Sequence, residues 1–195
     1  MQENKNTKSI EQILSKLDSR DTIQLLDLSY KNIKELPDLS RFKVRKLNIS
    51  HNNLDTLVMK NLPIYLVDLD VSHNKIKNTF NFVYAVERFG FKSKDNISKY
   101  IKRINLSYNE IKSVSFLLYK TEIKRIILSN NNLDDVTLYM NGKKLNYLDV
   151  SNNPKLSNIG TIDVVKIDTI KNNSINDIPL KFIEPPIIRE IIKRN

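Results

Sequence analysis

The chain has 195 residues, of which 40% are hydrophobic, and it carries a net charge of +10 without any cysteine. This length suits one domain with a buried core, and the missing cysteines exclude disulfide scaffolds, thiolate zinc sites and cysteine nucleophiles. No apolar run reaches the roughly 18–20 residues that cross a membrane, and the first ten residues lack the apolar segment of a secretory signal. We therefore expect a soluble intracellular protein, cytoplasmic in the simplest case, that does not engage membranes.

The basic charge allows two interpretations. The excess of 32 Lys and Arg residues over 22 Asp and Glu residues could serve an acidic partner such as nucleic acid. Lys, however, outnumbers Arg 24 to 8, and Ile and Asn are abundant as well. Lys, Ile and Asn have A/T-rich codons, so a low-GC genome is the other explanation of the charge.

The N-terminal segment, residues 1–21, is expected to form a helical cap. Residues 9–12 have the spacing of a capping box, which marks the start of a helix. Four apolar residues then share one helical face: Ile10, Ile13, Leu14 and Leu17. Such a helix would cover the first repeat of the segment that follows.

Residues 22–176 contain a repeated pattern, L-x-x-L-x-L-x-x-N-x-L, in which Leu, Ile and Val interchange. Six units follow it: residues 23–33, 44–54, 66–76, 101–111, 123–133 and 145–156. The pattern asparagines recur at spacings of 22, 35, 22 and 22 residues: Asn52, Asn74, Asn109, Asn131 and Asn153. Lys31 replaces the Asn in the first unit, and Pro154 delays the last apolar residue of the sixth. A degenerate seventh unit is expected near 164–175, with Asn172 or Asn173 in the Asn position.

Each unit predicts one short strand followed by a buried turn. Alternation along the strand sends pattern positions 4 and 6 inward and positions 3, 5 and 7 outward. Inward pairs such as Leu47 and Ile49 then stack into an apolar column that no repeat could bury alone. The turn leaves backbone groups unpaired, and an Asn amide offers the donors and the acceptor that satisfy them. We therefore predict a structural role for the pattern asparagines.

This pattern resembles that of the leucine-rich repeat family, specifically its short 22-residue intracellular class. The resemblance covers residues 22–176 and rests on six units in one phase. It implies an α/β repeat fold: a leucine-rich-repeat solenoid with one short parallel strand per repeat on a concave face and helical N- and C-terminal caps. The composition is also similar to that of small repeat proteins of AT-rich large DNA viruses, such as insect poxviruses.

Extra residues enter between the third and fourth units, near residues 78–99. They bring five aromatic residues into one short stretch: Phe80, Phe82, Tyr84, Phe89 and Phe91. A surface loop does not normally hold so many rings. Two interpretations remain: an enlarged helix on the convex side that packs on its neighbours, or an exposed aromatic docking site.

The C-terminal segment, residues 177–195, is expected to form a cap or a tail. Pro186 can open a helix there, since its missing N–H is not needed in the first turn. Four isoleucines of that helix share one face: Ile187, Ile188, Ile191 and Ile192. The helix would either cover the last repeat or dock on a partner.

No catalytic arrangement emerges from the pattern. His51 and His73 occupy one solvent-facing pattern position that holds Tyr or Asn in other repeats, which explains them better than a metal site. The three glycines form neither a P-loop nor a dinucleotide motif. Carboxylates recur at pattern position 5 in repeats too far apart for a catalytic pair: Asp27, Asp70 and Asp149. We expect no enzymatic activity, no cofactor and no metal; the alternative of another class is an enzyme domain or regulator with a hidden activity.

The outward residues predict a binding surface. Pattern positions 2 and 3 carry three basic pairs, which either form a solvated face with weak local ion pairs or, since like charges on adjacent strands repel, bind an acidic ligand. We predict a non-catalytic scaffold or adaptor that binds another protein, with an acidic segment, on the concave face. Nucleic acid is the alternative partner, although stacking aromatics on that side are few. The candidate contact residues are Tyr30, Arg45, Lys46, His51, His73, Lys102, Arg103, Tyr108, Lys124, Arg125 and Tyr147.

Overall fold

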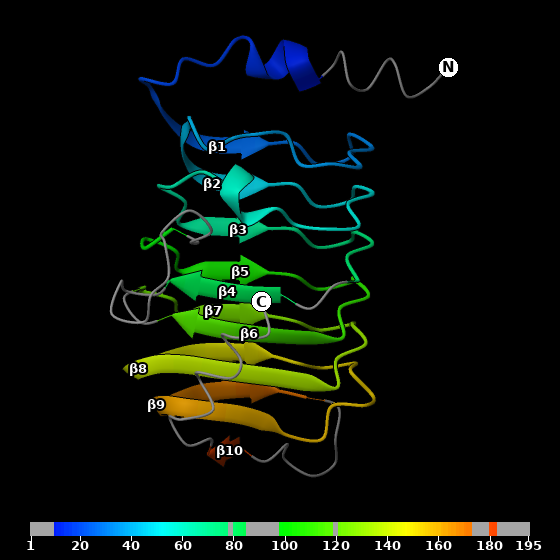
Figure 1. The fold of residues 1–195 in the computed structure, drawn as a ribbon, viewed down its shortest axis with the longest axis vertical. Coiled ribbons are helices and arrows are strands. Elements are labelled where there is room, and N and C mark those ends of the chain that lie inside the picture. The colour runs from blue at the N-terminus through cyan, green and yellow to red at the C-terminus, as the bar shows by residue number, and fades with distance from the viewer. Residues whose placement is uncertain (1–9, 78–79, 85–97, 119–120, 173–179, 183–195) are drawn as a thin grey trace.

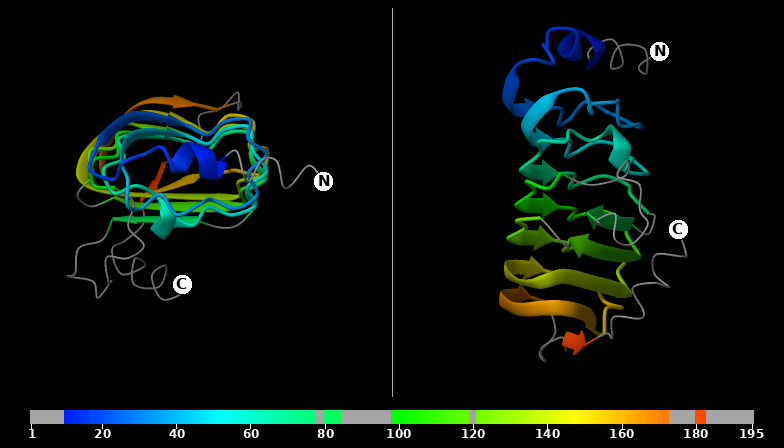
Figure 2. Two further views of the ribbon diagram at one scale, coloured as in Figure 1. Left: turned by 90° about the horizontal axis from the view of Figure 1, so that it is seen from above. Right: turned by 60° about the vertical axis from the view of Figure 1, so that its left-hand side comes forward.

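The structure, a computed structural model, describes residues 10–77, 80–84, 98–118, 121–172 and 180–182. These residues form a parallel-strand β-solenoid of about six turns, in which the chain winds around one axis and each turn lies against the next. Figure 1 shows the turns stacked from the N-terminus downward, and the view along the axis in Figure 2 shows their flattened outline. The repeat solenoid expected from the pattern is therefore confirmed.

One side of the solenoid is a sheet of seven parallel strands, here named the long sheet. Every neighbouring pair of these strands is parallel, and the register advances by one repeat from strand to strand. Its strands are β1 (Thr22–Asp27), β2 (Lys43–Asn48), β3 (Asp68–Asp70), β5 (Arg103–Asn105), β7 (Arg125–Ile127), the end of β8 (Asp135–Asp149) and the end of β9 (Ile159–Lys171).

The opposite side is a shorter parallel sheet, named the short sheet. It contains β4 (Phe80–Tyr84), β6 (Ser113–Leu118), the beginnings of β8 and β9, and β10 (Leu180–Phe182). Strands β8 and β9 continue around the bend from the short sheet to the long sheet. Their pairing is irregular between Tyr139 and Lys144, where Gly142 adopts φ +71°, a conformation that glycine accepts without a steric penalty.

The core lies between the two sheets and follows from the repeat. Leu47 pairs with Leu69, and Leu69 with Ile104, so that the inward residues of successive strands stand in one column. All three are buried, as is Phe116 of β6, which faces the column from the short sheet side of the same core. Because each turn covers the apolar edge of its neighbour, the turns are stable only as a stack.

The insertion does not interrupt the long sheet. Asp68 of β3 pairs directly with Arg103 of β5, so these two strands are neighbours in register although the insertion separates them in the sequence. Phe80–Tyr84 form β4, which pairs in parallel with β6, and the helix expected in this part of the insertion is therefore wrong. The alternation of Phe80, Phe82 and Tyr84 with smaller residues is typical of a strand. Phe89 and Phe91 lie outside the described residues, as do the side chains of β4.

The helical caps are not supported as predicted. In the described part of the N-terminal segment, which begins at residue 10, residues 10–14 are helical, and the apolar residues Ile10, Ile13, Leu14 and Leu17 pack against the core (Figure 1). The other helical segment in the described part of the chain is the 3-10 turn η1 (Met59–Asn61). In the C-terminal segment, residues 180–182 are the strand β10, which extends the short sheet, and the isoleucines of the expected helix lie outside the described residues.

The turns lie in a nearly straight column (Figures 1 and 2). A concave face requires one side of the solenoid to be shorter along the axis than the other. In the lower turns both sides are β-strands with the same spacing of about 4.8 Å, so neither side is compressed. Lys171 pairs with Asp149, so the register does not align Asn172 with the pattern asparagine Asn153, and Asn173 lies outside the described residues.

Candidate functional site

The pattern asparagines stitch each turn to the one before it. The Asn52 side-chain oxygen accepts hydrogen bonds from the backbone N–H groups of Lys31 and Ile33, both at 3.0 Å, and its amide donates to the Leu28 carbonyl at 2.9 Å. The same arrangement recurs at Asn74, Asn109, Asn131 and Asn153, all of them buried. Their amides are fully used within the fold. The structural role predicted for these residues is therefore confirmed.

The direction of these bonds explains Lys31. Each Asn serves the turn that precedes it in the chain, as Asn52 serves the turn of Ile33. Lys31 occupies the Asn position of the first turn of the repeat, which has no earlier repeat above it to satisfy. A residue without an amide is therefore tolerated at this one position of the pattern.

The recurring carboxylates of pattern position 5 also hold the turns. The Asp27 carboxylate accepts hydrogen bonds from the backbone N–H and the hydroxyl of Ser29, at 2.9 and 2.7 Å. Asp70 and Asp149 bind the serine two residues later in the same way, and Asn48 and Asn105 do so through their amide oxygens. These residues therefore close turns within their own repeats.

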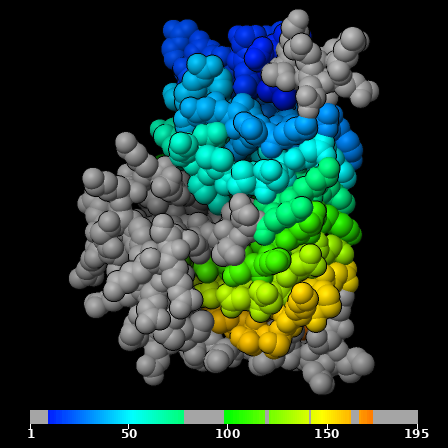
Figure 3. Space-filling model, turned by 45° about the vertical axis from the view of Figure 1, so that its right-hand side comes forward, coloured from blue at the N-terminus to red at the C-terminus, as the bar shows by residue number. Residues whose placement is uncertain are grey.

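Four aromatic rings form a continuous stack at the turns that follow the long-sheet strands; we name it the ring ladder. It consists of Tyr30, His51, His73 and Tyr108, with successive ring centroids 4.3, 4.1 and 4.1 Å apart and planes within 10° of parallel. All four residues have φ between 53° and 55°. Figure 3 shows this side of the molecule, where the successive turns form colour bands.

The ring ladder is presented to solvent by an uncommon backbone conformation. Left-handed φ values are rare outside glycine, and Asn adopts them most readily, as Asn130 and Asn152 do in the next two turns. The ladder continues there as an amide pair, since the Asn152 amide donates to the Asn130 oxygen at 2.8 Å. At its ends Tyr30 and Tyr108 are 72% and 50% exposed. The ladder is therefore an ordered and accessible row of hydrogen-bonding rings.

The surroundings of His73 affect its protonation. Partial burial, together with the neighbouring charge of His51, lowers the pKa of the His73 imidazole, and the Asp70 carboxylate partly opposes this. Among the residues that the structure describes, no group of three or more His, Cys, Asp or Glu side chains is placed to hold a metal ion. The histidines lie side by side on adjacent turns, as their spacing predicts.

Part of the basic cluster is neutralised within the fold. Arg103 donates to the Asp68 carboxylate at 2.7 Å and to Asp70 at 3.3 Å, and Lys102 lies 3.5 Å from Glu122. The expected unrelieved repulsion between the fourth and fifth repeats is therefore wrong for these two cations. Cross-strand partners of opposite charge stabilise a sheet, and Asp68 pairs directly with Arg103 although 34 residues separate them in the sequence. Asp68 and Arg103 both occupy pattern position 3 of successive units, so the sequence alone could have indicated this pair of opposite charges.

The remaining cations gather with three tyrosines at the N-terminal ends of the long-sheet strands; we name this region the basic edge. The Arg125 guanidinium lies over the Tyr147 ring at 4.1 Å, while Arg45 and Lys99 lie over the Tyr100 ring at 5.9 and 4.9 Å. The Tyr65 and Tyr100 rings stack at 5.9 Å. The basic edge consists of Arg45, Lys46, Tyr65, Lys99, Tyr100, Lys124, Arg125 and Tyr147.

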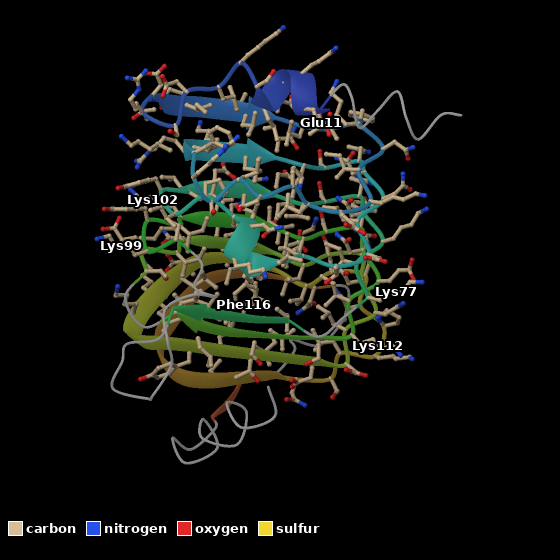
Figure 4. All side chains as sticks on the ribbon, turned by 45° about the horizontal axis from the view of Figure 1, so that its top comes forward. Glu11, Lys77, Lys99, Lys102, Lys112 and Phe116 are labelled. Carbon is tan, nitrogen blue, oxygen red and sulfur yellow. The ribbon has the colours of Figure 1, made fainter. Side chains whose placement is uncertain are left out.

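Sequence reasoning missed Tyr65 and Tyr100. Both stand one position before the first apolar residue of a repeat, outside the eleven-residue pattern, and the register brings them onto adjacent turns. The ring ladder and the basic edge lie at opposite ends of the same parallel strands. Figure 4 shows Lys99 and Lys102 at the edge where the strands begin, and Lys77 and Lys112 at the opposite edge.

No known protein family matches the chain, and no curated protein matches it either. Within the part of the chain that the structure describes, helices are too short and too polar to cross a membrane.

Proposed function

We propose that the protein is a non-catalytic interaction module of the leucine-rich repeat type, a cytoplasmic scaffold or adaptor that binds a segment of another protein. The observation that carries this proposal is the ring ladder beside the long sheet. Its rings are fixed by stacking at 4.1–4.3 Å and yet exposed at both ends of the ladder. Rigid aromatic side chains with hydrogen-bonding groups are favourable contact residues, because they lose little conformational entropy on binding.

The long sheet adds an extended contact area. Outward side chains of successive strands stand in columns, and Leu25 of β1 is 57% exposed on this face. Seven strands at about 4.8 Å span about 29 Å, the length of a helix of about 20 residues. The surface therefore suits a single helix or extended segment of a partner better than a broad globular face.

The charge of this face favours a partner segment that carries carboxylates. Lys46 and Arg125 are exposed, and neither forms an ion pair with a carboxylate among the described residues. A partner carboxylate could bind there without displacing an existing pair, whereas Arg103 already holds two. Of the residues predicted to contact a partner, Arg103 is thus the least available.

The family assignment is supported by the repeat geometry. The resemblance implies one short parallel strand per repeat, and the 22-residue register of the long sheet agrees with it; the inward apolar column and the hydrogen bonds of the pattern asparagines, expected from the residues themselves, add to this support.

The test is affinity capture with two matched variants followed by direct binding of the purified candidate. Tyr30→Asn with Tyr108→Asn removes the end rings, and Asn is known to fit this backbone because Asn130 and Asn152 occupy the same position. Tyr65→Thr with Tyr100→Thr is the control, since it removes two exposed tyrosines from the other end of the strands. We expect a protein that binds the wild type and the control but not the ladder variant. Equal capture by all three, or no captured protein at physiological salt, would contradict the proposal.

A further inference from the structure

We infer that the basic edge is a binding site for single-stranded nucleic acid. This inference rests on different residues from the ring ladder, although it shares Lys46 and Arg125 with the acidic partner segment proposed above. Proteins that bind single strands without sequence preference combine a row of cations that follows the phosphates with aromatic rings on which bases stack. The basic edge brings both kinds of group together on adjacent turns.

The rings of the basic edge are accessible. Tyr65 and Tyr100 are each 37% exposed, and their planes lie within 16° of each other. They belong to neighbouring turns, because Asp68 pairs with Arg103 and each tyrosine stands three residues earlier. Tyr147 adds a third ring two turns further along, covered by the Arg125 guanidinium, whose own plane can also stack on a base.

The cations of the basic edge are not paired with carboxylates of the described residues. Within the described residues, Arg45, Lys46, Lys99, Lys124 and Arg125 have no ion pair with a carboxylate, in contrast to Lys102 and Arg103. Three of them lie over tyrosine rings instead. A cation that is held over a ring is positioned to bind a phosphate whose base stacks nearby.

The length of the basic edge suits a short stretch of one strand. From β2 to the end of β8 the long sheet advances by four strand spacings, or about 19 Å. A stacked single strand advances by about 3.4 Å per phosphate, so five to six phosphates lie along this distance. Five cations are therefore enough to accompany the strand without a gap of more than one or two phosphates.

A single strand fits these residues better than a duplex. In a duplex the base faces are stacked inside the helix, so exposed tyrosines gain nothing from it beyond weak backbone contacts. Unpaired bases, in contrast, can stack on Tyr65, Tyr100 and Tyr147 while the phosphates follow the cations. An acidic protein segment would use the same cations but would not need the rings.

The test measures binding of a fluorescent oligothymidylate of about 20 nucleotides to the full chain by anisotropy, at several salt concentrations. With five phosphate contacts, log K should fall against log salt with a slope of about −3.5, since each contact to a single strand contributes about −0.7. Tyr65→Thr with Tyr100→Thr should weaken binding at least about tenfold and leave the slope unchanged. Lys124→Glu with Arg125→Glu should weaken binding and make the slope shallower.

Two control variants distinguish binding at the basic edge from a general attraction of the oligonucleotide to the positive charge of the protein. Lys77→Glu with Lys112→Glu makes the same charge change at the opposite edge (Figure 4), and Tyr30→Asn with Tyr108→Asn removes two exposed rings there. Both should bind the oligonucleotide within about twofold of the affinity expected from the general charge effect. Equal loss at both edges would overturn the inference in favour of non-specific attraction to the charge of +10.

The tyrosine variant distinguishes binding of nucleic acid from binding of other polyanions, because only nucleic acid has bases that stack on the rings. If Tyr65→Thr with Tyr100→Thr binds as well as the wild type, while the charge variant does not, the basic edge recognises charge alone and the inference is wrong. Should this variant fail to fold, ultraviolet cross-linking of the wild type to the oligonucleotide gives the answer, because contacts should map to Tyr65, Tyr100 or Tyr147. Cross-links confined to other peptides would overturn the site. The capture of a protein partner through the ring ladder is unaffected by either outcome.

Discussion

The imidazole rings of His51 and His73 lie face to face on adjacent turns, with their centroids 4.1 Å apart and a tyrosine stacked on each outer side. Burial of His73, together with a charge on His51, disfavours the protonated form of the His73 imidazole, so the folded state favours a neutral His73 ring.

Stability should therefore fall as the pH falls through the histidine range. Burial and His51 lower the pKa of His73 in the folded protein, whereas an unfolded histidine takes up its proton near about pH 6.5. The unfolded state then binds more protons, so the contribution of His73 to stability is fully present above about pH 6.5 and is lost as the pH falls through its lowered folded pKa. Thermal unfolding at about pH 7.5 and about pH 5.5 measures this difference.

The matched variant for this prediction is His73→Asn, because Asn occupies the same left-handed position in the next turns. It should reduce the loss of melting temperature between the two pH values. An unchanged pH dependence in the variant would show that other groups cause the effect.

Truncation of the inward column should be costly. Leu106 and Leu128 are fully buried in adjacent turns, and replacing either by Ala removes several methyl groups from a core that cannot collapse around the gap. We expect the free energy of unfolding to fall by about 2–5 kcal/mol in each case, measured by denaturant titration. Leu25→Ala, at an exposed position of β1, should change stability far less.

Loss of a pattern asparagine should destabilise the turn that precedes it in the chain. The Asn109 amide donates to the Val71 carbonyl at 3.1 Å, and its oxygen accepts from the Ile76 N–H at 3.1 Å. Asn109→Ala leaves these buried groups unpaired, at a cost of about 1–3 kcal/mol. Lys31→Ala is the matched control at the same pattern position, and it should leave the unfolding free energy nearly unchanged. Similar losses in both variants would contradict the direction of stitching.

Charge reversal should destabilise the protein more at Arg103 than at Arg125. Arg103→Glu places a third carboxylate beside Asp68 and Asp70, so the melting temperature should fall clearly below that of the wild type. Arg125→Glu removes a contact with the Tyr147 ring and should cost only about 0.5–1 kcal/mol. A thermal melt of each variant compares the two directly, and a larger loss for Arg125→Glu would be inconsistent with the ion-pair assignment.

The sequence predicts the long sheet well because its signals are local and periodic. The apolar positions that include Leu47 and Ile104 recur every turn, and the Asn amide has one evident use beside a buried turn. The short sheet is harder to predict, since β4 and β6 carry no marker residue comparable to the pattern asparagine. Its strands form because parallel neighbours are already aligned by the long sheet.

The candidate sites depend on neighbours that are distant in the sequence. Arg103 and Asp68 become partners only because β3 and β5 pair across the insertion, and Tyr65 and Tyr100 meet for the same reason. The ring ladder could be anticipated from the shared pattern position of His51 and His73. Its left-handed backbone and its parallel stacking are properties of the folded turns, and they do not follow from residue type alone.

Because each pattern asparagine bonds to the preceding turn, the turns can complete their hydrogen bonds only in a fixed order during synthesis. The backbone N–H groups of Ile33 and Leu54 donate to the side-chain oxygens of Asn52 and Asn74, which the ribosome adds about 20 residues later. During translation each turn therefore waits, incompletely hydrogen-bonded, until the next one has emerged. Each turn completes its hydrogen bonds only after the following turn has been synthesised. A prematurely ended chain therefore exposes a last turn whose backbone groups lack their asparagine partner.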